Sequence, residues 1–382
     1  MALVRSKSKM TARDRTGRPD YWLSISIILL ILVGLVTISS ASAVLSRTNN
    51  LPDNFYFFSQ AKSVFLGLIF LYIGYRIDYN FWKKISPILL GINIILLLAV
   101  FIPGIGINLN GANRWINLGF TTFQPSEAIK LTLILYLAAW LEKKGNEVTD
   151  IKKSVAPFVI LVVIIIGLLM KQPDMGTSTV LLSIAGLMYF VSGANYIHIA
   201  GMISLGAAGI WLLIKTEPYR MQRFMIFLNP SSDNSGTGYQ INQALMAVGS
   251  GGLLGLGFGK SRQKFNYLPE SSTDSIFAVI CEELGMLRAG LIVTLYILFA
   301  YRGYAVAKNA PDTFSRLVAV GITTWITAQA FINIFAILSL MPLTGVPLPF
   351  ISYGGSAIIM LMFSCGILLN ISKHNRGDGK CA

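Results

Sequence analysis

The chain has 382 residues, of which 54% are hydrophobic and only 13% are charged, and its mean hydropathy is +0.64. Soluble domains carry about 25% charged residues, so this composition excludes an ordinary soluble protein and predicts a membrane protein. The formal net charge of +14 does not indicate nucleic-acid binding, because that function needs a basic stripe on a soluble surface. Three cysteines without a C-x-x-C pair and two separated histidines predict neither a disulfide framework nor a metal site.

A basic arm, residues 1–21, precedes the first apolar run and holds six lysines and arginines. This arrangement mimics a signal peptide, and Ala41-Ser42-Ala43 resembles a cleavage site. The apolar run, however, is longer than an h-region of about 7–15 residues, and more apolar runs follow. We therefore predict an uncleaved first span.

Apolar runs of about 20 residues predict an all-α, polytopic membrane domain over residues 22–371. The expected ten spans are 22–45, 56–75, 85–103, 125–141, 154–170, 176–192, 196–215, 274–300, 316–339 and 354–371. A large loop, 216–273, separates the seventh span from the eighth and is the only extramembrane segment large enough to hold a reaction site.

Lysine and arginine are distributed unevenly between the two sides of this topology. Nineteen fall on the side of the termini, whereas the short loops of the other side carry four. The positive-inside rule therefore predicts that the basic arm and the tail, 372–382, are cytoplasmic. The basic residues of the 216–273 loop do not change this orientation, because long loops translocate largely regardless of charge.

The second outer loop, 103–125, places Trp115 beside Arg114 and suits an amphipathic segment at the membrane interface. We expect Ser126 to N-cap the helix that follows. Glu127 and Lys130, three residues apart, would then be neighbours on one face. A charged pair inside a span normally faces the bundle interior or a water-filled cavity.

Three further segments near the outer boundary are irregular. The helix before Lys171 should end at Pro173, which leaves Asp174 at the membrane surface. Three prolines in 341–355 predict an ordered, non-helical cap over the bundle. The glycine-rich run 249–259 lacks the GK[ST] ending of a phosphate-binding P-loop, so we expect a re-entrant or close-packed turn.

The stretch 263–285 carries an unusual density of charge and contains Asp274 within a turn of the eighth predicted span. A charge at mid-helix costs about 2.5–3.5 kcal/mol by insertion scales, and less near a helix end. We interpret Asp274 as the reaction centre; the alternative is a helix N-cap. Glu282 and Glu283 are predicted to be structural, with one of them pointing into the bundle or paired with a cation such as Arg288.

These motifs resemble the shape, elongation, division and sporulation (SEDS) family of bacterial peptidoglycan glycosyltransferases. The resemblance is carried by NGANRWINLGFTTFQPSEAIK at 110–130, KQPDMGTS at 171–178, YRMQRFMIFLNP at 219–230, the long block 238–285 with its LPESSTD, and PLTGVPLPFISYGGSA at 342–357. Within them, GKSRQKFNYLPE and YRMQRFMIFLNP look like the cell-division type, which we favour, whereas VPLP looks like the rod-shape type.

The resemblance implies an enzyme, an inverting glycosyltransferase that polymerises lipid II into β-1,4-linked glycan at the outer face of the bacterial cytoplasmic membrane. It also implies a class B penicillin-binding protein, a transpeptidase, as partner. The family's catalytic aspartate falls on Asp274, and two further motif pairs fall on Glu127 with Lys130 and on Arg220 with Arg223. The chain departs from the family in having Ser272 and Ser275 where histidine and phenylalanine are usual.

Glycosyl transfer from a lipid diphosphate needs a base on the acceptor hydroxyl and positive charge on the leaving group. We assign the base to Asp274. The diphosphate should meet the cations of the outer loops, with Asp174 also at the site; these candidates are Arg220, Arg223, Lys264, Arg114 and Lys171.

Several assignments have alternatives. Arg114 and Lys171 could instead contact anionic lipid headgroups, and Glu127 with Lys130 could be an internal salt bridge that orders the cavity. A divalent cation (Mg or Mn) bridging the diphosphate to Asp274 is chemically reasonable, although no dedicated ligand set is present.

Two other functional classes fit a basic protein with many spans. A flippase for lipid-linked sugars would use the bundle as a passage, but the chain shows no recurring half and no paired broken helices. A non-catalytic scaffold of the cell-wall synthesis complex is compatible with either activity.

Overall fold

The computed structural model describes residues 17–109, 112–117, 119, 122–229, 236–265 and 267–374. The α-helices are α1 (Tyr21–Ala41), α2 (Ala43–Thr48), α3 (Phe55–Arg76), α4 (Tyr79–Ala99), α5 (Pro125–Lys144), α6 (Ala156–Lys171), α7 (Met175–Val191), α8 (Tyr196–Thr216), α9 (Pro218–Leu228), α10 (Gly236–Gly251), α11 (Ile276–Lys308), α12 (Thr313–Ile337) and α13 (Gly355–Lys373). Short turns η2 (Gly145–Thr149) and η3 (Ile151–Val155) join α5 to α6, and three strands are β1 (Gly106–Leu109), β2 (Ala112–Asn117) and β3 (Thr122–Phe123).

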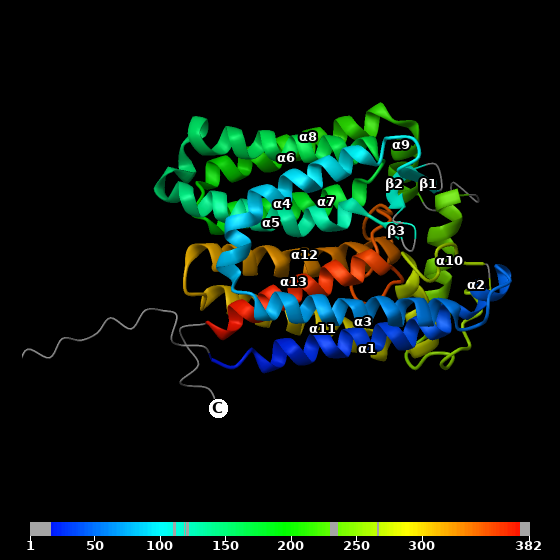
Figure 1. Ribbon diagram of the computed structural model, residues 1–382. Coiled ribbons are helices and arrows are strands. Elements are labelled where there is room, and N and C mark those ends of the chain that lie inside the picture. Colours follow the sequence, from blue (N-terminus) through cyan, green and yellow to red (C-terminus); the bar gives the residue numbers. More distant parts are fainter. Residues whose placement is uncertain are drawn as a thin grey trace, which may run out of the picture.

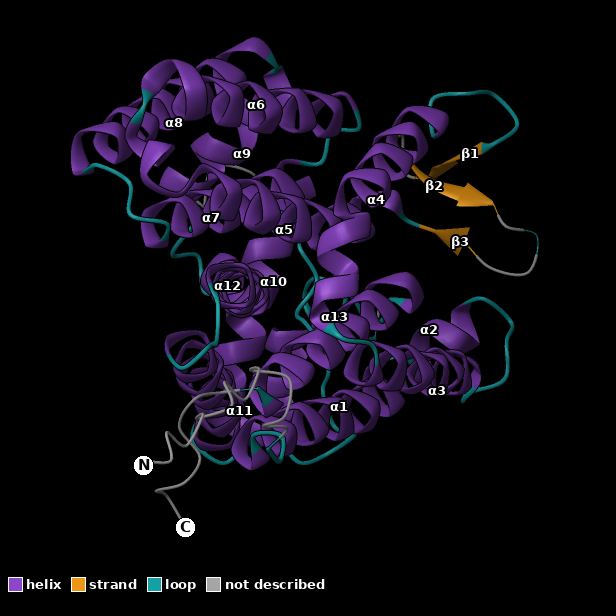
Figure 2. Cartoon of the chain, turned by 60° about the vertical axis from the view of Figure 1, so that its left-hand side comes forward, coloured by secondary structure: helices purple, strands orange, loops and turns teal. Residues whose placement is uncertain are grey.

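The long helices form two groups with α12 between them (Figures 1 and 2). One group contains α1, α3, α11 and α13, and the other contains α4 to α8. Helix α12 packs against α5 and α7 on one side and against α11 and α13 on the other. It is the most enclosed of the membrane-length helices, with 83% of its apolar window buried.

Each of the ten predicted spans coincides with a helix. Within the described residues, seven helical segments are long and apolar enough to cross a membrane. They are α1, α3, α4, the combined η3 and α6, α11, α12 and α13. Helix α7 is apolar but has 17 residues. The protein is therefore a multi-pass helical membrane protein.

Helix starts follow from side chains that satisfy free backbone N–H groups. Asp20 accepts from Leu23 N at 2.9 Å and caps α1, and Asp312 forms a capping box with Ser315 at α12. The predicted N-cap of α5, Ser126, was wrong by two residues, because the N-cap is Gln124. The helix begins at Pro125, which needs no N–H partner, and Ser126 lies inside the first turn rather than at the cap.

The expected all-α fold is interrupted by a three-stranded antiparallel sheet in the order β1-β2-β3. Trp115 lies opposite Ile107, and Ile116 lies opposite Phe123. The predicted outer loop, 103–125, was interpreted from its amphipathic character alone. A pair of strands can be amphipathic as well as a helix, so this pattern did not predict the sheet. Pairing three short strands satisfies backbone groups that no helix covers at this end of the bundle.

Helix α11 is broken at Gly285, where the backbone has φ 79° and ψ 169°. The glycine-rich turn (residues 251–259) fills the break: Leu256 N donates to Glu282 O at 2.9 Å, and Gly257 N donates to Glu283 O at 3.0 Å. A Cβ on Gly255 would lie 2.3 Å from Glu283 O, so only glycine permits this approach. The predicted close-packed turn is confirmed.

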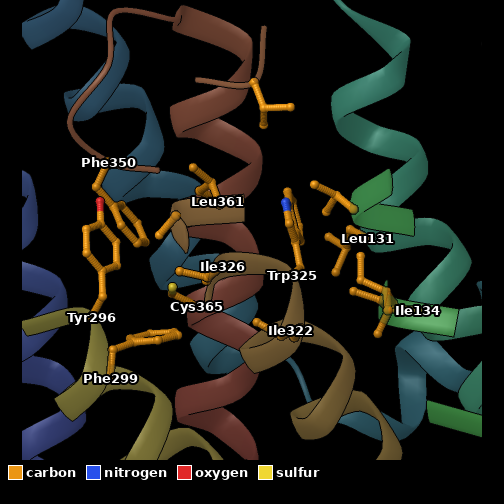
Figure 3. Close-up of a cluster of buried hydrophobic side chains, with 14 of the residues drawn as sticks. Leu131, Ile134, Tyr296, Phe299, Ile322, Trp325, Ile326, Phe350, Leu361 and Cys365 are labelled. Carbon is orange, nitrogen blue, oxygen red and sulfur yellow. The ribbon is translucent and has the colours of Figure 1, made fainter. Parts of the chain in front are cut away.

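The core around α12 is apolar and continuous (Figure 3). The indole of Trp325 projects from α12 and lies beside Leu131 and Ile134 of α5 (Figure 3). On α11, Tyr296 donates a hydrogen bond to Pro349 O and so connects this core to the segment between α12 and α13. Aromatic rings with a polar tip suit such boundaries.

Candidate active site

Most of the predicted site residues belong to elements at the end of the bundle opposite the described C-terminus (Figure 1). They come from β2, the start of α7, helix α9 and the turn before α11. The proline-rich segment (residues 341–354) crosses this end without regular secondary structure, as predicted. Elements far apart in the sequence thus surround Asp274.

The backbone on both sides of Asp274 is held by α12 and by the proline-rich segment. Asn333 Nδ2 donates to Asp274 O and to Val346 O, both at 2.7 Å. Ser352 Oγ donates to Thr273 O at 2.6 Å. A turn anchored on two sides keeps its side chain in one direction.

The carboxylate of Asp274 is not a helix cap. Ser275 occupies the N-cap position of α11, and its hydroxyl accepts from Gln240 Nε2 of α10 at 3.0 Å. Among the described residues, no hydrogen bond to the Asp274 carboxylate is present, although the residue is partly buried. A carboxylate without a structural partner remains available for chemistry.

Burial and neighbouring charges raise the pKa of Asp274 to about 7. Loss of hydration is the largest cause, and the Glu270 carboxylate adds to it. Arg114 and Arg223 act in the opposite direction, while Asp174 raises the pKa further. A pKa near neutrality is the value expected of a general base that must both accept and release a proton.

Arg114 and Asp174 meet at the turn between α6 and α7. Arg114 Nε donates to Gln172 O at 2.9 Å, and its Nη2 donates to Pro173 O at 2.6 Å. The Asp174 carboxylate accepts from Thr177 N at 3.0 Å and caps α7. The structure thus brings both predicted residues to the site and also gives each a positioning role.

Helix α9 contributes two arginines. Arg223 Nη1 donates to Leu343 O of the proline-rich segment at 3.3 Å. Its positive charge acts to lower the pKa of Asp274. Arg220, three residues earlier, is buried on a neighbouring position of the same helix. Lys171 lies at the end of α6 and is exposed.

Glu127 and Lys130 form a buried pair behind the site. Lys130 Nζ lies 2.8 Å from Glu127 Oε1, donates to Gln329 Oε1 at 2.9 Å and sits 4.9 Å from the Trp325 ring centre. Gln329 Nε2 in turn donates to Pro347 O at 2.9 Å. The geometry therefore supports the internal salt bridge, which orders the proline-rich segment, over direct substrate contact.

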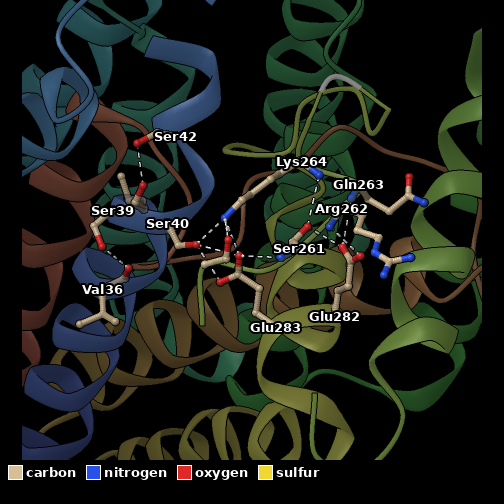
Figure 4. A network of polar contacts seen from close by, with 12 residues as sticks. Val36, Ser39, Ser40, Ser42, Ser261, Arg262, Gln263, Lys264, Glu282 and Glu283 are labelled. Carbon is tan, nitrogen blue, oxygen red and sulfur yellow. Dashed lines mark hydrogen bonds and ion pairs between the residues drawn. The ribbon is translucent and has the colours of Figure 1, made fainter. Parts of the chain in front are cut away.

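Lys264 does not have the geometry of a diphosphate ligand, which corrects our prediction. Its ammonium group is buried and donates to Glu283 Oε1 at 2.9 Å, to Ser40 Oγ at 3.0 Å and to Gly259 O at 2.8 Å (Figure 4). A buried carboxylate needs such a partner. The expectation that one of the two glutamates pairs with a cation agrees with this contact, although the cation is Lys264, and Arg288 instead donates to Leu254 O.

Glu282 holds the loop that leads toward Asp274. Its carboxylate accepts from Ser261 Oγ at 2.5 Å and from Arg262 N at 3.0 Å (Figure 4). The two adjacent glutamates of α11 thus bind one loop from two directions. Their predicted structural role agrees with these contacts.

Sequence reasoning missed the polar face of α12. Trp325, Gln329 and Asn333 follow one another at intervals of four residues and lie on one side of the helix. Two amides at this spacing in an otherwise apolar span were a readable signal. They connect the buried Glu127–Lys130 pair and the Asp274 turn to the same proline-rich segment.

Within the described ranges, no three histidine, cysteine, aspartate or glutamate side chains are placed to hold a metal ion. Asp274, Glu270 and Asp174 influence one another by charge but do not make such a set. A divalent cation bridging Asp274 to a diphosphate would take most of its ligands from the diphosphate and stays a prediction.

Known proteins resemble this chain over nearly its whole length. Stage V sporulation protein E of Bacillus subtilis is 41% identical over 94% of this chain and 98% of its own length. A probable peptidoglycan glycosyltransferase FtsW of Geobacter metallireducens is 40% identical over 94% of this chain and 96% of its own.

Solved structures have the same fold. A chain from a peptidoglycan synthase complex superposes with a TM-score of 0.77 and 27% identity, covering 94% of this chain and 99% of its own. The rod shape determining protein RodA of Thermus thermophilus gives a TM-score of 0.69 at 27% identity, over 94% and 98% of the two chains. Residues 21–377 match the profile of the FtsW/RodA/SpoVE family, described as a cell cycle protein, and the chain belongs to that family.

Proposed function

We propose that this protein is a peptidoglycan glycosyltransferase that polymerises lipid II into β-1,4-linked glycan strands for septal or side-wall synthesis. The observation that carries the proposal is the Asp274 carboxylate, which has a pKa of about 7 and no structural partner among the described residues. The name of the FtsW relative supports the same activity.

In the proposed reaction, Asp274 accepts the proton of the acceptor's 4-hydroxyl group as that oxygen attacks the anomeric carbon of the donor sugar. The bond from that carbon to the diphosphate breaks, the diphosphate leaves with the bonding electrons, and the configuration inverts. Arg114 and Arg223 lie near enough to Asp274 to lower its pKa. Their positive charges would stabilise the leaving diphosphate. Arg220 and Lys171 are further candidates for this contact.

The topology that suits this reaction has ten spans, with α5, α7 and α8 added to the seven apolar segments. Both termini are then cytoplasmic, and the 216–273 loop, with Asp274 directly after it, faces outward. The lysine and arginine distribution supports this orientation. A class B penicillin-binding protein is the proposed partner, consistent with the similarity to a chain from a peptidoglycan synthase complex.

Polymerisation of purified lipid II in detergent, with the partner supplied, tests the proposal. We expect polymer from the wild type and none from Asp274→Asn, whose amide cannot accept the proton. Glu270→Gln is the matched control, because it removes a neighbouring carboxylate and leaves the base in place. Equal Tm values for the three proteins would show that folding is intact.

Two results would overturn the assignment. One is normal polymerisation by Asp274→Asn. The other is a wild type that makes no polymer with its partner but moves lipid II across liposomes, and this outcome would favour a flippase.

A further inference from the structure

A pocket of about 640 Å³ lies between the start of α4 and the end of α5. These two helix ends lie at the end of the bundle away from the β1-β2-β3 sheet and α9 (Figure 1). It is lined by Asn80, Lys83, Lys84, Ala139, Glu142 and Lys143. Its volume falls within the range of about 300–1,000 Å³ typical of sites for small ligands. Nothing in the proposed reaction uses it.

The pocket carries a net positive charge. Lys83 forms an ion pair with Glu142, and its ammonium group also lies 5.6 Å from the ring centre of Phe314. Lys84 and Lys143 are exposed, and neither has an ion pair among the described residues. Two ammonium groups from different helices therefore face one hollow without neutralisation, an arrangement suited to the oxygens of a phosphate.

An apolar stripe begins one turn beyond these lysines. Ile88, Ile92 and Ile95 follow Lys84 at helical spacing on α4, and each is more than half exposed. Helix α4 is one of the segments long and apolar enough to cross a membrane. A ligand with a phosphate in the pocket and a hydrocarbon chain would extend along this stripe.

We propose that the pocket between α4 and α5 binds the headgroup of an anionic phospholipid, with its acyl chain lying along the exposed isoleucines of α4. The cationic rim next to an apolar stripe favours a lipid over an acidic peptide, because a peptide would leave the stripe uncovered. It favours a lipid over a soluble phosphate compound for the same reason. The bound lipid would bridge two helices of the group that carries Arg114 and Asp174 at its other end.

Native mass spectrometry of the purified full-length protein tests the proposal by counting bound lipid at increasing concentrations. The probes are phosphatidylglycerol, phosphatidylcholine and glycerol phosphate. We expect phosphatidylglycerol to bind more tightly than phosphatidylcholine, and glycerol phosphate to compete only weakly. In Lys84→Gln/Lys143→Gln the apparent affinity for phosphatidylglycerol should fall on the order of tenfold, because two cations near an anionic headgroup are lost.

Lys152→Gln/Lys308→Gln is the control, since it removes two exposed lysines that do not line the pocket. An equal loss of affinity in this control would show general surface charge and overturn the proposal. Unchanged binding in the Lys84/Lys143 variant would overturn it as well. Glycerol phosphate binding as tightly as the lipid would replace the lipid site with a soluble phosphate site.

Discussion

At the scale of single residues, the chemistry depends on how the surroundings of Asp274 set its affinity for a proton. Burial and Glu270 favour the neutral acid, whereas Arg114 and Arg223 favour the carboxylate. The balance leaves a pKa of about 7, so a small change in any neighbour alters the fraction of ionised base at physiological pH. The family resemblance predicted the position of Asp274. The effects of its neighbours on its pKa could be found only from the three-dimensional structure.

The polymerisation rate should follow the ionisation of Asp274. A base must be deprotonated to act, so we expect kcat/KM to fall about tenfold per pH unit below the pKa of about 7 and to level off above it. Burial is the largest cause of the raised pKa, and Glu270→Gln removes the charge that adds most to it, so the acidic limb should move to lower pH. An acidic limb unchanged in Glu270→Gln would contradict the electrostatic account.

Lys130 should matter for position rather than for contact with substrate. Lys130→Met leaves the buried Glu127 carboxylate unpaired, and removing one partner of a buried pair costs about 3–5 kcal/mol. The double variant Glu127→Gln/Lys130→Met should recover most of this loss, since no charge is then left alone. Thermal unfolding of the wild type, Lys130→Met and the double variant measures this recovery.

The activity of that double variant separates position from contact. If the pair acts only by ordering the proline-rich segment, the double variant should keep its KM for lipid II while kcat falls. A large rise in KM with kcat unchanged would instead indicate direct binding by Lys130.

At the scale of elements, hydropathy predicted the helices well, because a bilayer demands apolar runs of a set length. Hydropathy did not predict the small sheet or the break in α11. The sheet depends on backbone pairing within a short hairpin, and the break depends on hydrogen bonds from Leu256 and Gly257, earlier in the chain, to α11. Hydropathy does not encode which carbonyl meets which N–H in either case. Lys264 was misassigned because its partner Glu283 lies 19 residues away on α11, and the sequence does not show that the loop folds back onto that helix.

Gly255 should be required for the broken helix. Gly255→Ala places a methyl group 2.3 Å from Glu283 O at a φ of +83°, so the glycine-rich turn must withdraw from α11. We expect a markedly lower Tm and loss of polymerisation. Gly290→Ala, in α11, is the control, because its Cβ would meet nothing within 4 Å. It should be neutral or stabilising by about 0.5–1 kcal/mol, and a comparable loss there would contradict the argument.

At the scale of the whole molecule, α12 packs against both helix groups, and α13 also contacts α5 directly. The group membership was not predictable from ten similar apolar runs, since each could face lipid or protein. What identified the central helix in retrospect was its polar face, with Gln329 and Asn333 bonded to the proline-rich segment. A buried span can carry amides that a lipid-facing span cannot.

The enclosure of α12 has a consequence for how the protein senses its surroundings. With 83% of its apolar window shielded, this helix has little direct contact with acyl chains. Stretching or thinning the bilayer therefore acts first on the outer helices, such as α3 and α4, and reaches Asn333 only after passing through a layer of protein. We expect the geometry around the reacting sugar to be mechanically insulated from changes in membrane tension.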